Sequence, residues 1–302
     1  MKVLITGATG LIGKEIVKLC HAKGIVVHYL TTRKGQIVQQ ENYKGFYWNP
    51  ARGEVDVSCF EGVEAIINLA GASVAKRWTK SYKKEILNSR IQSLHVLKKG
   101  LESIESHSVK KLVSASAIGI YPSSLTNYYE EHTQVVDTTF LGNVVYQWEQ
   151  AADSIKELGI GVVKIRIGVV LAKGGGALKQ MATPVKYGLG APLGSGEQWQ
   201  SWIHIQDIAR LFMYAIENGL QGVYNGVAPN PINNKKLTKE IASVLRKPLF
   251  LPNIPKIILK ILMGTMAQIV YSSQRVSSKK IEEAGFSFQY KNVRSALEDL
   301  LK

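Results

Sequence analysis

The chain has 302 residues, 45% of them hydrophobic, and a formal net charge of +15 at pH 7. This length suits one large α/β domain with a smaller appendage. Lys and Arg are spread along the chain without long runs or interleaved aromatic residues, so the charge argues against a nucleic-acid partner and for a general attraction of phosphorylated small molecules.

A glycine-rich turn opens the chain. Residues 2–6 are predicted to form a short buried strand, and a helical period begins at Ile12. Gly7, Gly10 and Gly13 lie between them, at the spacing that lets backbone approach a pyrophosphate at a helix N-terminus. The sequence therefore predicts a dinucleotide site with contacts from Gly7, Thr9, Gly10, Leu11, Ile12 and Gly13.

The end of the second predicted strand, residues 25–31, indicates which dinucleotide binds. An NAD site usually has Asp or Glu here to hold the ribose 2′-hydroxyl. This chain has Thr32, Arg33 and Lys34 instead, and no acidic residue between these and Glu41. A guanidinium can bind a 2′-phosphate with two hydrogen bonds, so we predict NADP. A solvated basic loop is the alternative.

Strand and helix patterns alternate along the rest of the first half, which predicts a Rossmann-type doubly wound parallel sheet of the α/β class. Further strands are predicted to end at Trp48 and to span residues 64–68, 110–116, 161–171 and 222–226. Helices are predicted at residues 81–103, 140–158, 178–187, 207–218, 233–245, 255–270 and 291–301.

These elements suggest a division of the chain. Residues 1–171 are expected to form the NADP-binding domain, whose sheet continues at about residues 201–230. Residues 172–200, which are rich in glycine, and the mostly helical residues 231–302 are expected to form the substrate side. The helix at 255–270 is apolar and basic; we expect it to pack with Lys256 and Lys260 facing water rather than to contact a membrane.

Two cysteines, Cys20 and Cys59, match no metal-binding or redox spacing. We expect buried, reduced thiols and no metal site, as in a cytoplasmic protein. The first strand is predicted to begin at Lys2, so we expect no secretory signal. Assembly as a homodimer is left open.

Several motifs together resemble those of a known family. The chain is similar to an atypical branch of the extended short-chain dehydrogenase/reductase superfamily, the epimerase-family oxidoreductases that resemble nucleoside-diphosphate-sugar epimerases. The resemblance covers nearly the whole chain, including a C-terminal region of unknown function, and implies NAD(P) binding with contacts from Leu69, Ala70, Gly71 and Ser114. It rests on residues 6–13, 68–71, 77–78, 88–90, 114–117 with Tyr121, 148–149, 166–171, 201–207, 274–275 and 283–286.

The chain departs from that superfamily at the catalytic pair. Working members use Tyr-x-x-x-Lys, in which the Lys lowers the Tyr pKa for proton exchange with a substrate hydroxyl. None of the 13 tyrosines here has Lys four residues later, and Leu141 and Val145 stand at the expected places. The resemblance therefore supports NADP binding more strongly than sugar-nucleotide epimerisation.

Three residues are candidates for catalysis, and we expect them to face a pocket between residues 172–196 and the C-terminal helices. Ser116, at the end of a strand, has either a substrate-binding or a capping role. Tyr121 is a substitute acid or an aromatic wall. His204 is a proton donor or a structural residue, and Asp207 after it is predicted to cap a helix.

Arg90, on the helix predicted at 81–103, and Arg166, on the strand predicted at 161–171, are candidates for anion contacts near the cofactor or the substrate. Surface or framework ion pairing is the equal alternative. The sequence thus predicts an NADP-dependent oxidoreductase of the epimerase/dehydratase type acting on an unidentified small molecule. A non-catalytic NADP(H)-sensing or regulatory protein is the alternative, because the Tyr/Lys pair is missing.

Overall fold

The computed structural model describes residues 1–302. Its main sheet has the strand order β13-β9-β7-β6-β1-β2-β4-β3, with β5 also paired to β4. All neighbours from β13 to β4 are parallel, and β3 and β5 run antiparallel to β4. The strands are β1 (Lys2–Thr6), β2 (Val26–Thr31), β3 (Gln39–Gln40), β4 (Tyr43–Asn49), β5 (Glu54–Val55), β6 (Ala65–Asn68), β7 (Lys111–Ala117), β9 (Gly161–Ile167) and β13 (Gly222–Gly226).

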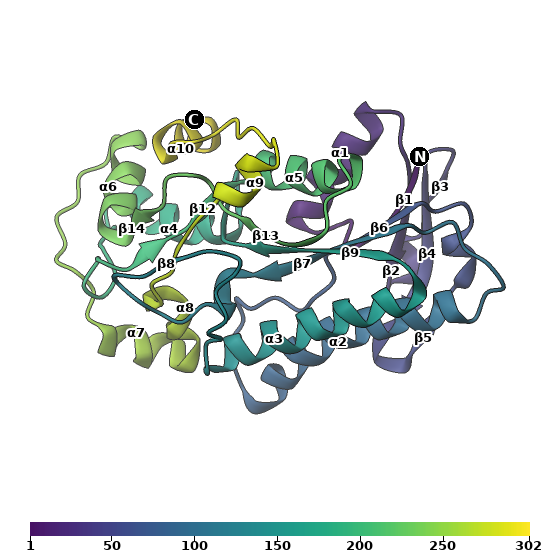
Figure 1. Ribbon diagram of the computed structural model, residues 1–302. Helices are drawn as coiled ribbons and strands as arrows, with labels where there is room; N and C mark the ends of the chain where they lie inside the picture. The colour runs from purple at the N-terminus through teal and green to yellow at the C-terminus, as the bar shows by residue number, and fades with distance from the viewer.

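Helices cover both faces of this sheet. Figure 1 shows α2 (Lys80–Glu102) and α3 (Phe140–Asp153) on one side, and α1 (Leu11–Ala22) and α5 (Ile205–Glu217) on the other. The central strands are consequently buried and apolar, as parallel strands between two helical layers must be. The predicted Rossmann-type fold is confirmed, with order reversing between β1 and β6, where ligands bind in such sheets.

The strand predicted at residues 161–171 is divided in two. β9 ends at Ile167, and β10 (Val169–Ala172) leaves the main sheet to pair in parallel with β12 (Trp202–His204). Gly168 lies at the division, where a Cβ would stand 2.2 Å from the carbonyl oxygen of Ser201. Because Gly168 has no side chain, the chain can pass this close to the backbone of Ser201, and the second sheet begins at this point.

Small helices and two-residue strands complete the structure. They are β8 (Tyr128–Tyr129) with β15 (Arg275–Val276), β11 (Trp199–Gln200) with β14 (Ile232–Asn233), α4 (Gly176–Lys186), α6 (Asn234–Val244), α7 (Lys256–Met263), α8 (Gln268–Tyr271), α9 (Lys279–Glu283) and α10 (Val293–Leu301). The single helix expected at 255–270 is wrong: Gly264, with φ of 60°, ends α7. None of the helices combines the length and the apolar character needed to cross a bilayer.

Both cysteines are free and buried, as expected. Burial raises the pKa of the Cys20 thiol on α1 to about 12 and also raises the pKa of Cys59. The Sγ atom of Cys20 lies 3.7 Å from Sδ of Met213, at the contact between α1 and α5. Neither thiol is a nucleophile in the folded chain.

The stability of this fold should fall in mild acid because His28 on β2 is buried. Its Nδ1 lies 2.8 Å from the Cys59 carbonyl oxygen, to which it donates, and burial lowers its pKa. Below about pH 6.5 the unfolded chain gains a proton at His28 that the folded chain does not, so the free energy of unfolding decreases as pH falls.

His28→Asn keeps an N–H donor but does not titrate. Urea unfolding gives the free energy of unfolding at each pH. Between about pH 7 and pH 5 this free energy should change less steeply with pH in the variant than in the native chain, by at most about 1.4 kcal/mol per pH unit. His204, whose pKa is also lowered by burial, supplies part of the remaining slope. Equal slopes in the two proteins would contradict the assignment.

Candidate cofactor site

A pocket of about 1010 Å³ opens at the carboxyl ends of β1, β2, β4 and β6. It lies where the strand order reverses. Its lining comes from the loops after these strands and from α1 and α2: Gly7, Thr9, Lys14, Leu30, Thr31, Thr32, Arg33, Gln36, Trp48, Asn49, Pro50, Ala51, Ala70, Gly71, Ala72, Glu85, Asn88, Ser89 and Gln92.

The loop from β1 to α1 has the form that a bound pyrophosphate requires. Gly7 has φ of 72°, and a Cβ there would lie 3.1 Å from the backbone of Leu69. A Cβ on Gly13 would lie 2.2 Å from the carbonyl oxygen of Gly7. Gly10 is exposed, and no side chain caps the N-terminus of α1. The first N–H groups of α1 and the open space beside Gly10 therefore form an anion cradle that a side chain would fill.

The end of β2 brings positive charge to the pocket. Arg33 lines it and forms no ion pair within the protein, so its guanidinium is available to a ligand. Lys34 is not part of the lining; its Nζ lies 5.0 Å from the ring centre of Tyr47. Lys14 is the second basic residue of the lining, and Glu85, on α2, is its one acidic residue.

A buried polar group holds the loop after β6 in place. The Thr6 hydroxyl donates to Oδ1 of Asn68 at 2.8 Å and accepts from the N–H groups of Leu69 and Ala70 at 3.0 and 3.1 Å. Nδ2 of Asn68 donates to Oγ of Ser114 at 3.2 Å. The predicted contact residues Ala70 and Gly71 line the pocket, whereas Ser114 is fully buried and fixes Asn68.

Arg90 supports this loop from behind. Its Nη1 donates to the carbonyl oxygens of Ile86 at 2.8 Å and Ala72 at 3.2 Å, and its guanidinium lies 5.1 Å from the Trp148 ring. Burial lowers its pKa to about 10. A Cβ on Gly71 would lie 3.1 Å from Cζ of Arg90, so the two residues are in close contact. Arg90 positions the loop and is not part of the pocket lining.

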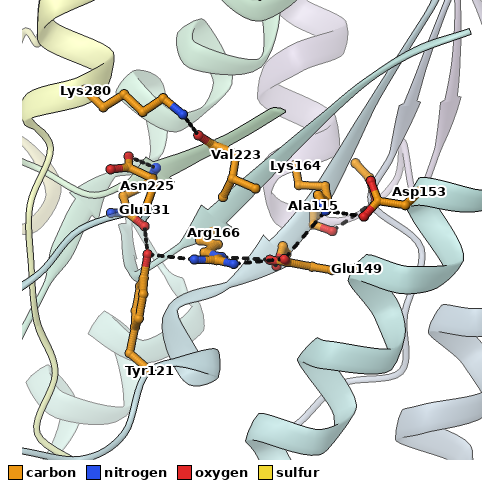
Figure 2. Close-up of polar contacts among 12 residues, drawn as sticks. Ala115, Tyr121, Glu131, Glu149, Asp153, Lys164, Arg166, Val223, Asn225 and Lys280 are labelled. Atoms are coloured by element: carbon orange, nitrogen blue, oxygen red, sulfur yellow. Dashed lines mark hydrogen bonds and ion pairs between the residues drawn. The ribbon is translucent and has the colours of Figure 1, made fainter. Parts of the chain in front are cut away.

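Arg166 takes part in a second buried group, which we call the ion cluster: Ser116, Tyr121, Glu149, Arg166 and Asn225. Arg166 donates to both carboxylate oxygens of Glu149, from Nε at 2.8 Å and from Nη2 at 3.0 Å. Figure 2 shows the planar pair and the neighbouring contact of Lys164 with Asp153, at 2.6 Å. Burial opposes the charge of Arg166, but the hydrogen bonds and charge of Glu149 prevail and raise its pKa.

The hydroxyls of two of the three candidate catalytic residues belong to the same cluster. Oγ of Ser116 donates to Glu149 at 2.6 Å. The Tyr121 hydroxyl donates to Oδ1 of Asn225 at 2.8 Å and accepts from Nη1 of Arg166 at 3.0 Å (Figure 2). Burial raises the pKa of Tyr121, so the phenol keeps its proton at neutral pH. Both donors are thus occupied by partners within the protein.

His204 occupies a different place. It is fully buried, its ring stacks on Tyr290 with centres 3.8 Å apart, and its Nε2 lies 3.2 Å from Asp299. Its Nδ1 accepts from the N–H of Gln206 at 3.2 Å, which makes His204 the N-cap of α5. Burial lowers its pKa. These contacts account for His204 as a structural residue of the α5 terminus.

The prediction that Asp207 caps this helix is wrong, because α5 begins two residues earlier, at Ile205. Asp207 is buried in the first turn instead. Its two carboxylate oxygens accept from the N–H groups of Gln289 and Tyr290, each at 2.9 Å, and Oδ1 also accepts from Arg210. Asp207 therefore ties the segment before α10 to α5, a role that no local sequence pattern indicates.

The structure does not meet the expectation that Ser116, Tyr121 and His204 face one pocket. It brings the first two together in the ion cluster, leaves His204 apart, and places none of them in the lining of the pocket. Leu141 and Val145 lie beside the turn after β7, where a Cβ on Gly119 would be 3.8 and 3.9 Å from them. Apolar side chains therefore stand where a Tyr/Lys pair was sought.

Several lining residues were missed from the sequence. Lys14 directly follows the glycine motif, and this proximity was a usable signal. Most of the others come from the end of β4 and from α2, and they reach the pocket only through the topology of the sheet. They are Leu30, Thr31, Gln36, Trp48, Asn49, Pro50, Ala51, Ala72, Glu85, Asn88, Ser89 and Gln92. Of these, only Asn88 and Ser89 lie in a motif of the family resemblance, residues 88–90.

Residues 3–226, which include the main sheet and this pocket, match the model of the "NAD dependent epimerase/dehydratase family". The chain belongs to this family. Residues 254–300 match a second model, that of a domain of unknown function (DUF1731). An epimerase family protein of Staphylococcus aureus (strain MRSA252) is 37% identical over 299 residues, covering 99% of this chain and 98% of its own length.

Solved structures agree with this membership. The crystal structure of human epimerase family protein SDR39U1 with NADPH is 30% identical, covers 99% of both chains and has a TM-score of 0.85. The nucleoside-diphosphate sugar epimerase of Corynebacterium glutamicum is 26% identical with a TM-score of 0.80, covering 100% of this chain and 58% of that one. The fold is therefore that of an NAD(P)-dependent epimerase family.

Gly10→Val should abolish dinucleotide binding without unfolding the chain. Gly10 is exposed, and a Cβ there would meet only the Gly7 carbonyl oxygen, at 3.1 Å, so the added methyl groups would enter the anion cradle. Calorimetric titration with NADPH measures the loss, and circular dichroism checks the fold. Gly161→Val, at the first residue of β9, is the control: its φ is not positive, and a Cβ there would meet only the Lys110 carbonyl oxygen, at 3.5 Å. Normal binding by Gly10→Val would mean that the phosphates lie elsewhere.

Proposed function

We propose that this protein is an NADP(H)-dependent oxidoreductase of the epimerase/dehydratase family that acts on a small molecule other than a sugar nucleotide. The observation that carries the cofactor assignment is Arg33, which lines the pocket at the end of β2 with no internal ion pair. A 2′-phosphate is the dianionic group that distinguishes NADP from NAD, and a free guanidinium there favours it. The NADPH in the human relative's structure supports the same choice.

The remaining cofactor contacts follow from the pocket. The backbone of Gly7–Gly13 would hold the pyrophosphate, and Lys14 adds a second positive charge to the same wall. Thr32, which also lines the pocket, would complete the 2′-phosphate contact, and Lys34 would add positive charge beside it from outside the lining. When bound, NADP supplies the hydride-transfer chemistry. Residues 172–200 and 231–302 would border the substrate, since they follow the carboxyl ends of the sheet strands.

The side chains near the ends of β7 and β9 argue against epimerisation by a tyrosinate. The phenol of Tyr121 is hydrogen-bonded inside the ion cluster and its pKa is raised. Ser116 donates to Glu149 rather than into the pocket, and no Lys pairs with a Tyr at the required spacing. We infer that the protein orients cofactor and substrate, while proton exchange takes place with solvent or with a group on the substrate.

A second candidate function is NADP(H) sensing without turnover. Leu141 and Val145 favour it, because their apolar side chains fill the place of an acid–base pair. An isotope-transfer experiment distinguishes the two functions. The protein is incubated with stereospecifically deuterated NADPH and a metabolite extract. Transfer of the label to a metabolite supports the oxidoreductase, whereas tight binding without transfer supports the sensor.

NADPH should bind more tightly than NADH, and Arg33→Ala should remove most of that preference. Loss of a charge-assisted hydrogen bond to a phosphate costs about 1.5–3 kcal/mol, or roughly 10- to 150-fold in affinity. Calorimetric titration of both cofactors gives the difference. Arg294→Ala, on the distant helix α10, is the matched control and should leave the preference intact. Equal affinities for the two cofactors in the native chain would overturn the assignment.

The protein should not interconvert common sugar nucleotides such as UDP-glucose and UDP-galactose. The physical reason is the absence of a tyrosine whose pKa is lowered by a neighbouring lysine. Chromatography of the sugar nucleotides after prolonged incubation with NADP⁺ and NADPH provides the measurement. Robust turnover would refute this prediction and would direct attention to Tyr121 as the proton carrier.

A further inference from the structure

One helix of the C-terminal region presents its apolar side to solvent. The side chains of Ile257, Ile258, Ile261 and Leu262 on α7 are 67%, 43%, 74% and 72% exposed. Only Leu259 of this helix is buried. The sequence expectation of a packed helix with only its lysines facing water is therefore wrong.

The arrangement on α7 follows helical periodicity. The four exposed residues form one stripe, because positions four apart in a helix lie on the same side. Lys256 and Lys260, also four apart, border the stripe, while Leu259 and Met263 face the protein. A helix with an apolar stripe bordered by lysines is the pattern of segments that lie in the plane of a membrane surface.

Neighbouring loops extend this surface. Figure 1 shows the chain between α6 and α7 running along the edge of the molecule, and there Phe250 is 78% and Leu251 43% exposed. The loop after α4 adjoins it, since Leu193 is bridged to Ile254, and carries Tyr187 and Leu189, which are 78% and 62% exposed. These segments contain half of all the large hydrophobic side chains that are exposed in the protein.

All formal side-chain charges in these segments are positive. The chain has no acidic residue between Glu157 and Glu197, or between Glu240 and Glu282. The exposed basic residues forming the edge of the surface make no ion pair: Lys186, Arg246, Lys247, Lys256 and Lys260. We call these five residues and the eight exposed apolar residues named above the basic apolar face.

We propose that the basic apolar face docks the protein reversibly on an anionic lipid surface. Apolar side chains gain from entering the headgroup boundary, and unpaired lysines gain from a negative surface potential. A second copy of the chain fits less well, because a twofold contact would place the same lysines opposite one another. The proposal is independent of the cofactor and the reaction, since none of these residues lines the cofactor pocket.

The test is co-sedimentation of the full chain with vesicles. We expect binding to vesicles of equal parts phosphatidylcholine and phosphatidylglycerol, little binding to phosphatidylcholine alone, and weakening at high salt. Lys256→Glu with Lys260→Glu should reduce the partition coefficient by at least roughly 25-fold, because each lost lysine costs about fivefold and each added carboxylate is repelled in addition. Ile257→Ser with Ile261→Ser should reduce it by at least about tenfold.

Matched controls change the same chemistry elsewhere. Lys84→Glu with Lys99→Glu, at exposed positions on α2, makes the same change of net charge. Leu125→Ser with Val135→Ser removes apolar side chains that are 56% and 64% exposed. Both control variants should bind vesicles like the native chain. Circular dichroism and the melting temperature verify that every variant is folded.

Three outcomes would overturn the proposal. The first is no binding of the native chain to anionic vesicles. The second is equal loss of binding in the α7 variants and their controls, which would show only a general charge effect. The third is a concentration-dependent dimer, seen by analytical ultracentrifugation, that Ile257→Ser with Ile261→Ser abolishes while vesicle binding is absent. That result would assign the face to self-association.

Discussion

The contact between Gly13 and the backbone of Gly7 is the constraint on which the site depends. A Cβ on Gly13 would lie 2.2 Å from the Gly7 carbonyl oxygen and 2.7 Å from Cα of Ala8, so only glycine allows α1 to begin this close to β1. The close approach directs the free N–H groups of α1 toward the loop after β6. Thr6, through its hydrogen bonds to that loop, holds the opposite wall, and the pocket takes its shape between the two.

The ion cluster shows how polar groups are accommodated inside this sheet. Glu149 and Arg166 are both nearly buried, and removing either partner would leave an uncompensated charge, a change that typically costs about 3–5 kcal/mol. The pair does not by itself make the fold more stable than apolar residues would. It does fix the hydroxyls of Ser116 and Tyr121, and so links the ends of β7, β9 and β13 to α3.

The sequence predicted the parts of this structure that local patterns control. The alternating strands and helices, the glycine loop and the basic end of β2 are contiguous motifs, and each was located within a few residues. The partners of Ser116, Tyr121 and His204 were not predictable, because Glu149, Asn225 and Asp299 are between 33 and 104 positions away along the chain. A residue's type and position on a strand do not reveal whether its hydroxyl meets a ligand or a buried carboxylate.

The same limit of local patterns explains why α7 was predicted to be packed. Its composition is apolar, but composition does not show which side of a helix contacts the protein, and here Leu259 is the one buried residue. Asp207 was misassigned for a related reason, since a helix start and a buried first-turn carboxylate share the same local sequence.

The two buried thiols can report on local opening of the folded chain. Cys20 lies at the contact between α1 and α5, and Cys59 lies in the segment next to β2, where its carbonyl oxygen accepts from His28. An alkylating reagent can modify either sulfur only while the surrounding segment is transiently open, so the two alkylation rates measure how often each segment opens. Because α1 also forms one wall of the pocket, any molecule that occupies the cradle should slow alkylation of Cys20 more than alkylation of Cys59.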